Sequence, residues 1–455
     1  MKENLSYKFI KRIYHLNNLE FSPAVIHQAK RCLLDYLGVC YAGSKILETK
    51  SRKYFDLIGQ TGSSNLIGIN QKSSIHDAIL WHGMNSHVPE LDDGIRYGVL
   101  HPGSPIISAL MPIAEKENIE NVELLRGIIV GYETSIRLAS AIQPSHYSMG
   151  FHPTSTCGTI GAAIGIAAML KYTENEMFQT LSAACLSAYG TLKVIEDGSE
   201  LKPYNSGRAA LNGFISAYIG KSFFAGDKDP LGGTTGFLSM MSSGFDEKEL
   251  FGNKAKLAIE NIYFKPYASC RHTHPAIEAA LAIKISNGLL INDIKKITIR
   301  TYKSVLGKHD YKEIINLASA KMSIPYSVAL ALKTGKAGLS DYNETNLEDI
   351  EIITLCKNTI VEEDEKITSL VPHSRAANVI IEMKSGEVFN HRIDYPKGEP
   401  ENPMSDDELL DKFLYLITYW GMDNSNAQSI ISSIMKLENE ENSIFEIIKT
   451  AEKKI

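Results

Sequence analysis

Several features of well-known protein classes are absent from this sequence. The six cysteines form no C-x-x-C pair, and we interpret them as buried or incidental thiols in a reducing compartment. No apolar run reaches the roughly 18 residues needed to cross a bilayer, and the charged N-terminus, MKENLSYKFIKRIYHL, has no signal-peptide core. The net charge of −6 lacks the basic excess of a general nucleic-acid binder. We therefore expect a cytoplasmic protein without nucleic-acid or membrane partners.

What is present is the composition of an ordinary globular protein, with 44% hydrophobic and 22% charged residues. A chain of 455 residues is too long for one compact core, so two domains are expected. Helix-start signals recur early, at Ser22-Pro23 and at Thr173-x-x-Glu176. Residues 157–170 are so rich in glycine and alanine that we predict a central helix buried on all sides, without the G-x-x-x-x-G-K-[ST] phosphate loop.

The pattern changes at about residue 265. KKITIRTY (295–302) alternates apolar and polar residues and predicts a strand. A second strand is expected at EIITLCKNTIV (351–361). VIIEMKSGEVFNHRIDY (379–395) predicts a hairpin with its turn at Ser385-Gly386.

Helices are expected among these strands, at 275–287 and 324–334, so residues 265–396 have the pattern of an α+β domain. Helix returns after residue 397, where Ser405-x-x-Glu408 is another capping box. We therefore predict a mainly α fold. A large all-helical domain is formed by both chain ends, 1–264 and 397–455, and the α+β domain is inserted between them.

The segment 87–103, HVPELDDGIRYGVLHPG, has the glycines and prolines of a loop. Its acids and histidines are His87, Glu90, Asp92, Asp93 and His101. Three acids within four residues repel one another unless they are hydrated, hydrogen-bonded or bound to a metal. An exposed acidic turn and a metal site are the alternatives to a catalytic loop. Because no zinc or two-metal spacing motif is present, we expect no metal.

Two further segments are typical of helix starts that hold an anion. His152 lies in GFHPTST, where free N–H groups of the helix would attract negative charge. A simple N-cap with a surface histidine is the alternative. Lys202 and Arg208 flank a Pro-Tyr-Asn-Ser-Gly turn before an Ala-rich helix. Cations oppose the helix dipole there, which favours an anion between them, and solvated side chains are the alternative.

A fourth segment, FKPYASCRHTHP, contains Lys265, Arg271, His272 and His274. Tyr326 begins an apolar helix in SAKMSIPYSVALAL, where an ordinary core tyrosine is the alternative. Histidine exchanges protons near neutral pH, and cations gather in these turns although the whole chain is acidic. The set predicts a pocket, assembled from distant loops, for proton transfer on a di- or tricarboxylate.

Read in order, these segments resemble the MmgE/PrpD family, which includes 2-methylcitrate dehydratase, cis-aconitate decarboxylase and iminodisuccinate epimerase. The resemblance runs nearly end to end, through LLDYLGVCYAGS (33–44), ELDDG…HPG, GFHPT, KPYASCRHTHPAIEA, AKMSIPYSVALAL and KGEPENPMSDDELLDKF. It implies a helical domain with an inserted α+β lid, a homodimer, no cofactor and a small-molecule carboxylate substrate.

The resemblance also implies site residues. Five positions match the catalytic cleft of the decarboxylase branch: His101, His152, Lys202, His274 and Tyr326. Three positions depart from it, because Glu90 falls near a family Asp, Gly94 lies where the decarboxylase has Thr, and Asn205 lies where many members have His. These departures argue against decarboxylation of cis-aconitate.

We assign roles on this basis. Lys202, His152 and Arg271 would hold substrate carboxylates, and His101 or His274 would move the proton. Tyr326 would donate or relay it, and Asp93 would orient a histidine. Further substrate-binding candidates are His87, Glu90, Asp92, Asn205, Arg208 and His272.

The sequence thus predicts a cofactor-independent acid–base enzyme, foremost a lyase of the 2-methylcitrate dehydratase type. An epimerase of an iminodisuccinate-like amino-dicarboxylate and a cis-aconitate-type decarboxylase are alternatives, because all three reactions develop negative charge beside a carboxylate. A catalytically silent carboxylate-binding paralogue is the non-enzyme alternative.

Overall fold

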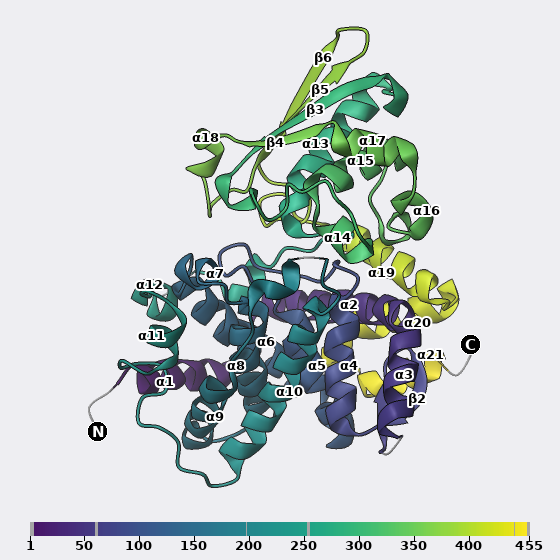
Figure 1. Cartoon of the computed structure of the whole chain (residues 1–455). Helices are drawn as coiled ribbons and strands as arrows, with labels where there is room; N and C mark the ends of the chain where they lie inside the picture. Colours follow the sequence, from purple (N-terminus) through teal and green to yellow (C-terminus); the bar gives the residue numbers. More distant parts are fainter. Residues whose placement is uncertain (1–3, 60–61, 197, 253–254, 441, 453–455) are drawn as a thin grey trace.

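The computed structural model describes residues 4–59, 62–196, 198–252, 255–440 and 442–452. It is mainly helical with a small sheet, as predicted, and has two parts (Figure 1). The helical part comprises α1–α12, α19–α21 and the two-stranded sheet β1-β2, so it is not all-helical as predicted. The sheet part comprises α13–α18 with a four-stranded sheet. Each part has a large buried cluster of apolar side chains, and the cluster of the sheet part includes Val39 and Leu416 of the helical part. The two parts therefore pack against each other.

Helices begin where the sequence signals a start. The Ser22 side chain accepts the Val25 N–H at the start of α2 (Pro23–Ile46). Reciprocal capping boxes open α9 (Glu174–Ser187) and α19 (Asp406–Trp420), as Thr173-x-x-Glu176 and Ser405-x-x-Glu408 predicted. Further elements are α1 (Leu5–Asn17), α3 (Glu48–Ile58), β1 (Ser64–Leu66), β2 (Ile69–Ser73), α4 (Ile75–His87), α5 (Gly103–Lys116), α7 (Ser145–Ser148), α11 (Phe237–Met241) and α12 (Glu247–Phe251).

The glycine-rich helix lies at the centre of the helical part, as predicted. All residues of α8 (Pro153–Met169) are buried. Its glycines let α6 (Asn121–Ala141) approach closely, because a Cβ on Gly161 would lie 2.6 Å from the Ser135 Cβ and 2.8 Å from the Gly131 oxygen. The tight packing holds the start of α8, and with it His152, in a fixed place.

The sheet of the sheet part has the strand order β4-β3-β5-β6. The central strand β3 (Ile294–Thr301) is parallel to β4 (Thr359–Glu363) and antiparallel to β5 (Ala377–Met383), which pairs with β6 (Val388–Ile393). The last two strands form the predicted hairpin. The predicted helices are α13 (His274–Asn287) and α15 (Ile324–Thr334), which share the sheet's core; α14 (Leu317–Met322), α16 (Glu344–Leu347) and α18 (Glu365–Thr368) are shorter.

Two local predictions were wrong. Most of 351–361 is helix, α17 (Ile350–Lys357), because Asp349 caps it and the Ile352, Leu355 and Cys356 side chains are buried on one face. The segment after Lys202 is not a turn before a helix. It is the first turn of α10 (Lys202–Lys221), where proline is tolerated because the first N–H groups need no helical partner.

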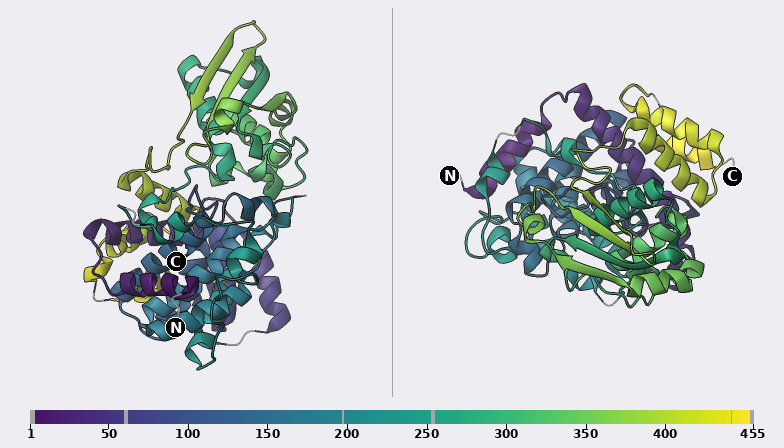
Figure 2. Two further views of the ribbon diagram at one scale, coloured as in Figure 1. Left: turned by 90° about the vertical axis from the view of Figure 1, so that its left-hand side faces the viewer. Right: turned by 90° about the horizontal axis from the view of Figure 1, so that it is seen from above.

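The C-terminal helices α19, α20 (Asn424–Met435) and α21 (Ile444–Glu452) return to the helical part (Figure 2). Lys412 on α19 binds Asp35 on α2 at 2.6 Å, and Phe413 and Ile417 join the main core. No helix in the described parts of the chain is long and apolar enough to cross a membrane.

Candidate active site

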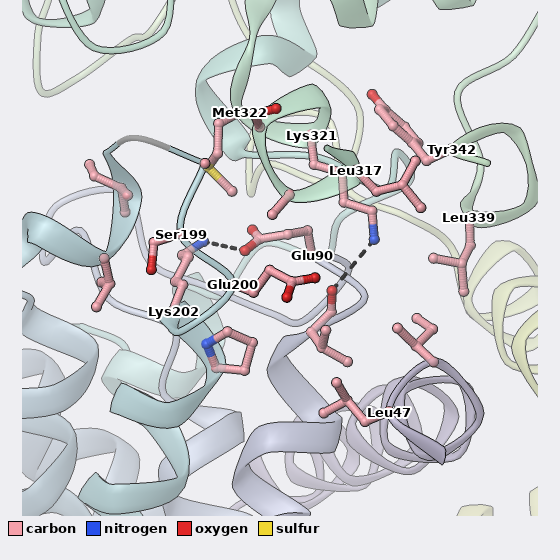
Figure 3. A pocket seen from close by; sticks show the side chains of 18 of the residues that line it. Leu47, Glu90, Ser199, Glu200, Lys202, Leu317, Lys321, Met322, Leu339 and Tyr342 are labelled. Atoms are coloured by element: carbon pink, nitrogen blue, oxygen red, sulfur yellow. Dashed lines mark hydrogen bonds and ion pairs between the residues drawn. The ribbon is translucent and has the colours of Figure 1, made fainter. Parts of the chain in front are cut away.

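Among the cavities where the helical part meets the sheet part, two are lined by Lys202. The histidine cavity, about 50 Å³, is lined by His101, His152, Lys202, Tyr263, Cys270, Arg271, His272, His309, Arg375 and apolar neighbours. The large cavity, about 360 Å³, is shown in Figure 3 and is bordered by Glu90, Lys202, Lys321 and many aliphatic side chains. Lys202, Ile195 and Met322 line both cavities. The structure therefore brings five of the sequence-predicted residues to one cavity: His101, His152, Lys202, Arg271 and His272.

His101 has a defined tautomer. Its Nδ1 lies 2.7 Å from the Asp93 carbonyl oxygen, which can only accept, so Nδ1 carries the proton. Burial, with the nearby charge of Lys265, lowers the pKa of His101 to about 3. The ring is thus neutral at physiological pH, and its Nε2 holds a lone pair. A neutral imidazole of this kind is a proton acceptor.

His152 has the opposite tautomer. It is the N-cap residue of α8, and its Nδ1 accepts from the Asn205 side-chain amide at 3.3 Å. The same amide nitrogen donates to the Thr191 carbonyl at 3.1 Å, which fixes its orientation. Burial lowers the pKa of His152 well below its ordinary value, so the neutral ring carries its proton on Nε2. It is a proton donor.

Glu90 links two lysines at the cavities. Its carboxylate binds Lys202, and Lys265 lies 3.4 Å away and is fully buried. These cations hold the pKa of Glu90 below its usual range although burial alone would raise it. The Glu90 backbone has φ +60°, a left-handed conformation that is uncommon outside glycine. The surroundings therefore impose a strained backbone to keep this carboxylate in place.

His87 and Asp92 contact residues of the site without lining either cavity. The His87 Nδ1 lies 2.5 Å from Asp92 Oδ2, and the His87 ring centroid is 5.3 Å from that of His101. Lys265 also contacts Asp92, at 3.3 Å. Neither His87 nor Asp92 lines the two cavities, so they position other groups rather than face a ligand.

Asp93 contacts His101 through its backbone only. Its side chain accepts from the Gly103 N–H at 3.0 Å and from the Tyr132 hydroxyl at 2.7 Å. Burial and the charges of Asp35 and Asp92 raise the pKa of Asp93 to about 8. The carboxyl group is therefore protonated at neutral pH.

Among the other predicted residues, His274, Tyr326 and Arg208 also lie away from both cavities. His274 is fully buried, accepts from Arg271 at 2.9 Å through Nδ1 and donates to the Ser269 carbonyl through Nε2 at 3.2 Å. Tyr326 is buried in the sheet part and its hydroxyl has no partner among the described residues. Arg208 binds the Tyr189 carbonyl at 2.6 Å and Ser155 at 3.2 Å. His274 thus supports Arg271 rather than facing the cavity.

Arg271 lines the histidine cavity and is held from its other side. Its guanidinium binds Glu399 at 2.9 Å and stacks over the Tyr263 ring at 4.6 Å. Glu399 is 2% exposed and also pairs with Arg96 at 2.9 Å. The return segment after β6 therefore fixes this arginine.

Sequence reasoning missed several lining residues, among them Tyr263, His309, Lys321 and Arg375. His309 stacks on His272 at 4.9 Å, and His272 hydrogen-bonds to the Tyr302 hydroxyl. A histidine in the turn segment GKHDY (307–311) was the available signal. Lys321 lies within α14 and within the motif AKMSIPYSVALAL, and Arg375 lies just before β5, but neither lies in a cluster of cations and histidines that would single it out.

One group of residues could hold a metal ion. The possible ligand atoms of Cys270, His272 and His309 all lie within 4.8 Å of one another. Within the described ranges, this is the only group of three or more His, Cys, Asp or Glu side chains whose ligand atoms lie so close together. The acids of the loop 87–103 do not form such a group. The sequence pointed to that loop as the metal alternative, so any metal chemistry would involve different residues.

Comparison with known proteins identifies the family. The MmgE/PrpD N-terminal domain matches residues 10–250, and the MmgE/PrpD C-terminal domain matches residues 267–438. The chain belongs to the MmgE/PrpD family. The predicted resemblance is confirmed, whereas the domain borders after 264 and 396 stay predictions.

The similar proteins are named as decarboxylases, a decarboxylase-like protein and dehydratases. The cis-aconitate decarboxylase-like protein oryM of Aspergillus oryzae is 24% identical over 96% of this chain and 95% of its own. Cis-aconitate decarboxylase of Homo sapiens is 21% identical over 91% of this chain and 88% of its own length. 2-Methylcitrate dehydratase of Salmonella typhimurium is 25% identical over 66% and 64%. These similarities support an enzyme and leave its specific reaction open between the two types.

Proposed function

We propose that the protein is an acid–base lyase that removes water from a hydroxylated di- or tricarboxylate, in the manner of 2-methylcitrate dehydratase. The observation that carries the proposal is the pair of neutral imidazoles with opposite tautomers. His101, whose Nε2 is bare, and His152, whose Nε2 is protonated, line one cavity beside Lys202. Elimination of water needs one base and one acid in a single site.

His101 Nε2 takes the proton from the carbon next to a substrate carboxylate. The C–H electron pair forms the C=C bond as the neighbouring C–O bond breaks, and His152 Nε2–H protonates the leaving hydroxyl, which departs as water. The proton held by His101 then returns to the His152 imidazolate, so both rings are neutral again. Lys202 and Arg375 offset the negative charge that develops on the carboxylate, because both line the cavity.

Decarboxylation is the second candidate, favoured by relatives of that name that match nearly the whole chain. The glycine at position 94 argues against decarboxylation. A Cβ at this position would lie 2.3 Å from the Tyr263 hydroxyl, so the threonine expected of the decarboxylase branch does not fit beside Tyr263. The site around Gly94 is therefore built differently, and dehydration stays our first proposal.

Proton NMR in D₂O with pooled hydroxylated di- and tricarboxylates tests the proposal. A dehydratase gives new vinyl signals with no loss of carbon. Release of labelled CO₂ from carboxyl-labelled cis-aconitate would indicate the decarboxylase instead, and deuterium exchange at a retained stereocentre would indicate an epimerase. Absence of all three, with wild-type folding shown by circular dichroism, would leave a non-catalytic binding protein and refute the proposal. The homodimer stays a prediction that sedimentation in the same buffer can test.

A further inference from the structure

Lys321 differs from the other buried lysines of the described residues. Four lysines are buried: Lys30, Lys202, Lys265 and Lys321. The first three bind carboxylates. Lys30 binds Glu438, Lys202 binds Glu90, and Lys265 binds both Glu90 and Asp92. Lys321 has no carboxylate within ion-pair distance there. Its ammonium group contacts only two backbone carbonyls, of Pro89 at 3.3 Å and of Val88 at 3.5 Å.

A buried ammonium without a counter-ion is unfavourable. Burial lowers the pKa of Lys321 to about 8, with Lys265 and Lys202 acting in the same direction and Glu90 opposing them. The carbonyl contacts satisfy the N–H groups weakly at these distances and supply no negative charge. What this group lacks is an anion.

The open side of Lys321 is the large cavity. Figure 3 shows Lys321 reaching in from the sheet part, across from Lys202 and Glu90 of the helical part. The ammonium groups of Lys321 and Lys202 contact consecutive residues of the loop. Lys321 binds the carbonyls of Val88 and Pro89, and Lys202 binds the side chain of Glu90. A tricarboxylate can therefore place one carboxylate beside each ammonium group and keep a third at the reacting carbon, with a cavity of about 360 Å³ that suits a small ligand.

We propose that Lys321 binds a carboxylate of the substrate that is remote from the reacting carbon, so that the substrate spans the helical part and the sheet part. The inference rests on the proposed function and adds a specificity residue to it. The aliphatic walls from Leu47, Leu317 and Leu339 strengthen this ion pair, because they exclude water from it. A ligand with fewer carboxylates would leave Lys321 unpaired.

Binding can be tested without turnover by isothermal titration with propane-1,2,3-tricarboxylate and with pentanedioate, which has one carboxylate fewer. In wild type the tricarboxylate should bind more tightly. In Lys321→Met its affinity should fall about 10- to 100-fold, and the preference over pentanedioate should shrink. Lys50→Met is the matched control, because Lys50 borders the same cavity but is half exposed and pairs with Glu200 at 2.7 Å. It should bind like wild type.

Unchanged affinity in Lys321→Met, an equal loss for both probes, or no binding of the tricarboxylate by wild type would each overturn the inference. Melting curves of all variants show whether the fold is kept, and Lys321→Arg should restore part of the preference if charge is what matters. Turnover by wild type with normal KM in Lys321→Met would refute this role alone. Lys321-dependent binding without any turnover would instead refute the proposed function.

Discussion

Asp93 allows a sharp test of the electrostatics around the site. Its buried carboxyl has a pKa raised from 3.8 to about 8 by burial and by its acidic neighbours. At neutral pH the folded protein therefore keeps a proton that the unfolded chain has released. Because the unfolded state then binds fewer protons, the free energy of unfolding must fall as the pH rises between about 4 and 8.

The variant Asp93→Asn removes this titration and keeps the shape, since an amide can serve both the Gly103 N–H and the Tyr132 hydroxyl. In this pH range, each rise of one pH unit lowers the free energy of unfolding of the wild type by about 1.4 kcal/mol. The stability of the variant relative to wild type should therefore rise by about 4 kcal/mol from pH 5 to pH 8. Urea unfolding followed by circular dichroism at several pH values measures this difference.

Asp423→Asn is a suitable control, because this exposed residue caps α20 and its pKa is lowered by hydrogen bonds from Ser425 and Asn426. Its stability difference from wild type should stay constant from pH 5 to pH 8, since Asp423 is ionised throughout in both states. If Asp93→Asn behaves in the same way, Asp93 is ionised in the native protein and the reasoning is refuted.

Three further predictions concern activity and packing. His101→Gln should lower kcat at least about 100-fold with an unchanged melting temperature, and near-normal turnover of the NMR substrate would remove His101 as the base. Gly94→Thr should destabilise the protein by about 1–3 kcal/mol in urea unfolding, because the new Cβ meets the Tyr263 hydroxyl at 2.3 Å; an unchanged midpoint would contradict this close contact. kcat/KM should fall above a pH of about 8 as Lys321 loses its proton, and a profile flat to pH 10 would show that this charge does not serve the substrate.

The loops of the site could be predicted because their chemistry is concentrated in short turn segments. His101, His152 and Lys202 each lie in such a segment, and all three reach one cavity. His274 has the same signal but faces Arg271 and a backbone carbonyl instead. A sequence pattern places a residue at a helix start, whereas the packing of neighbouring elements decides which way its side chain points.

The sheet-part cations could not be predicted in this way. Lys321 is the next-to-last residue of α14, and Arg375 lies just before β5, so each has the local sequence of an ordinary element. Their place at the cavities depends on how the sheet part packs on the helical part. Segment 351–361 failed for a related reason, because burial of one helix face outweighed the strand preference of its β-branched residues.

The chain's crossing from the sheet part back to the helical part has a consequence for how this protein can vary. Residues 396–399 resemble a connecting linker, yet the carbonyls of Pro396 and Lys397 and the carboxylate of Glu399 all hold Arg271. Elsewhere, a loop that joins two bodies tolerates extra residues. Here one inserted residue would shift an arginine at the cavity wall, so the length of this crossing is tied to the position of Arg271.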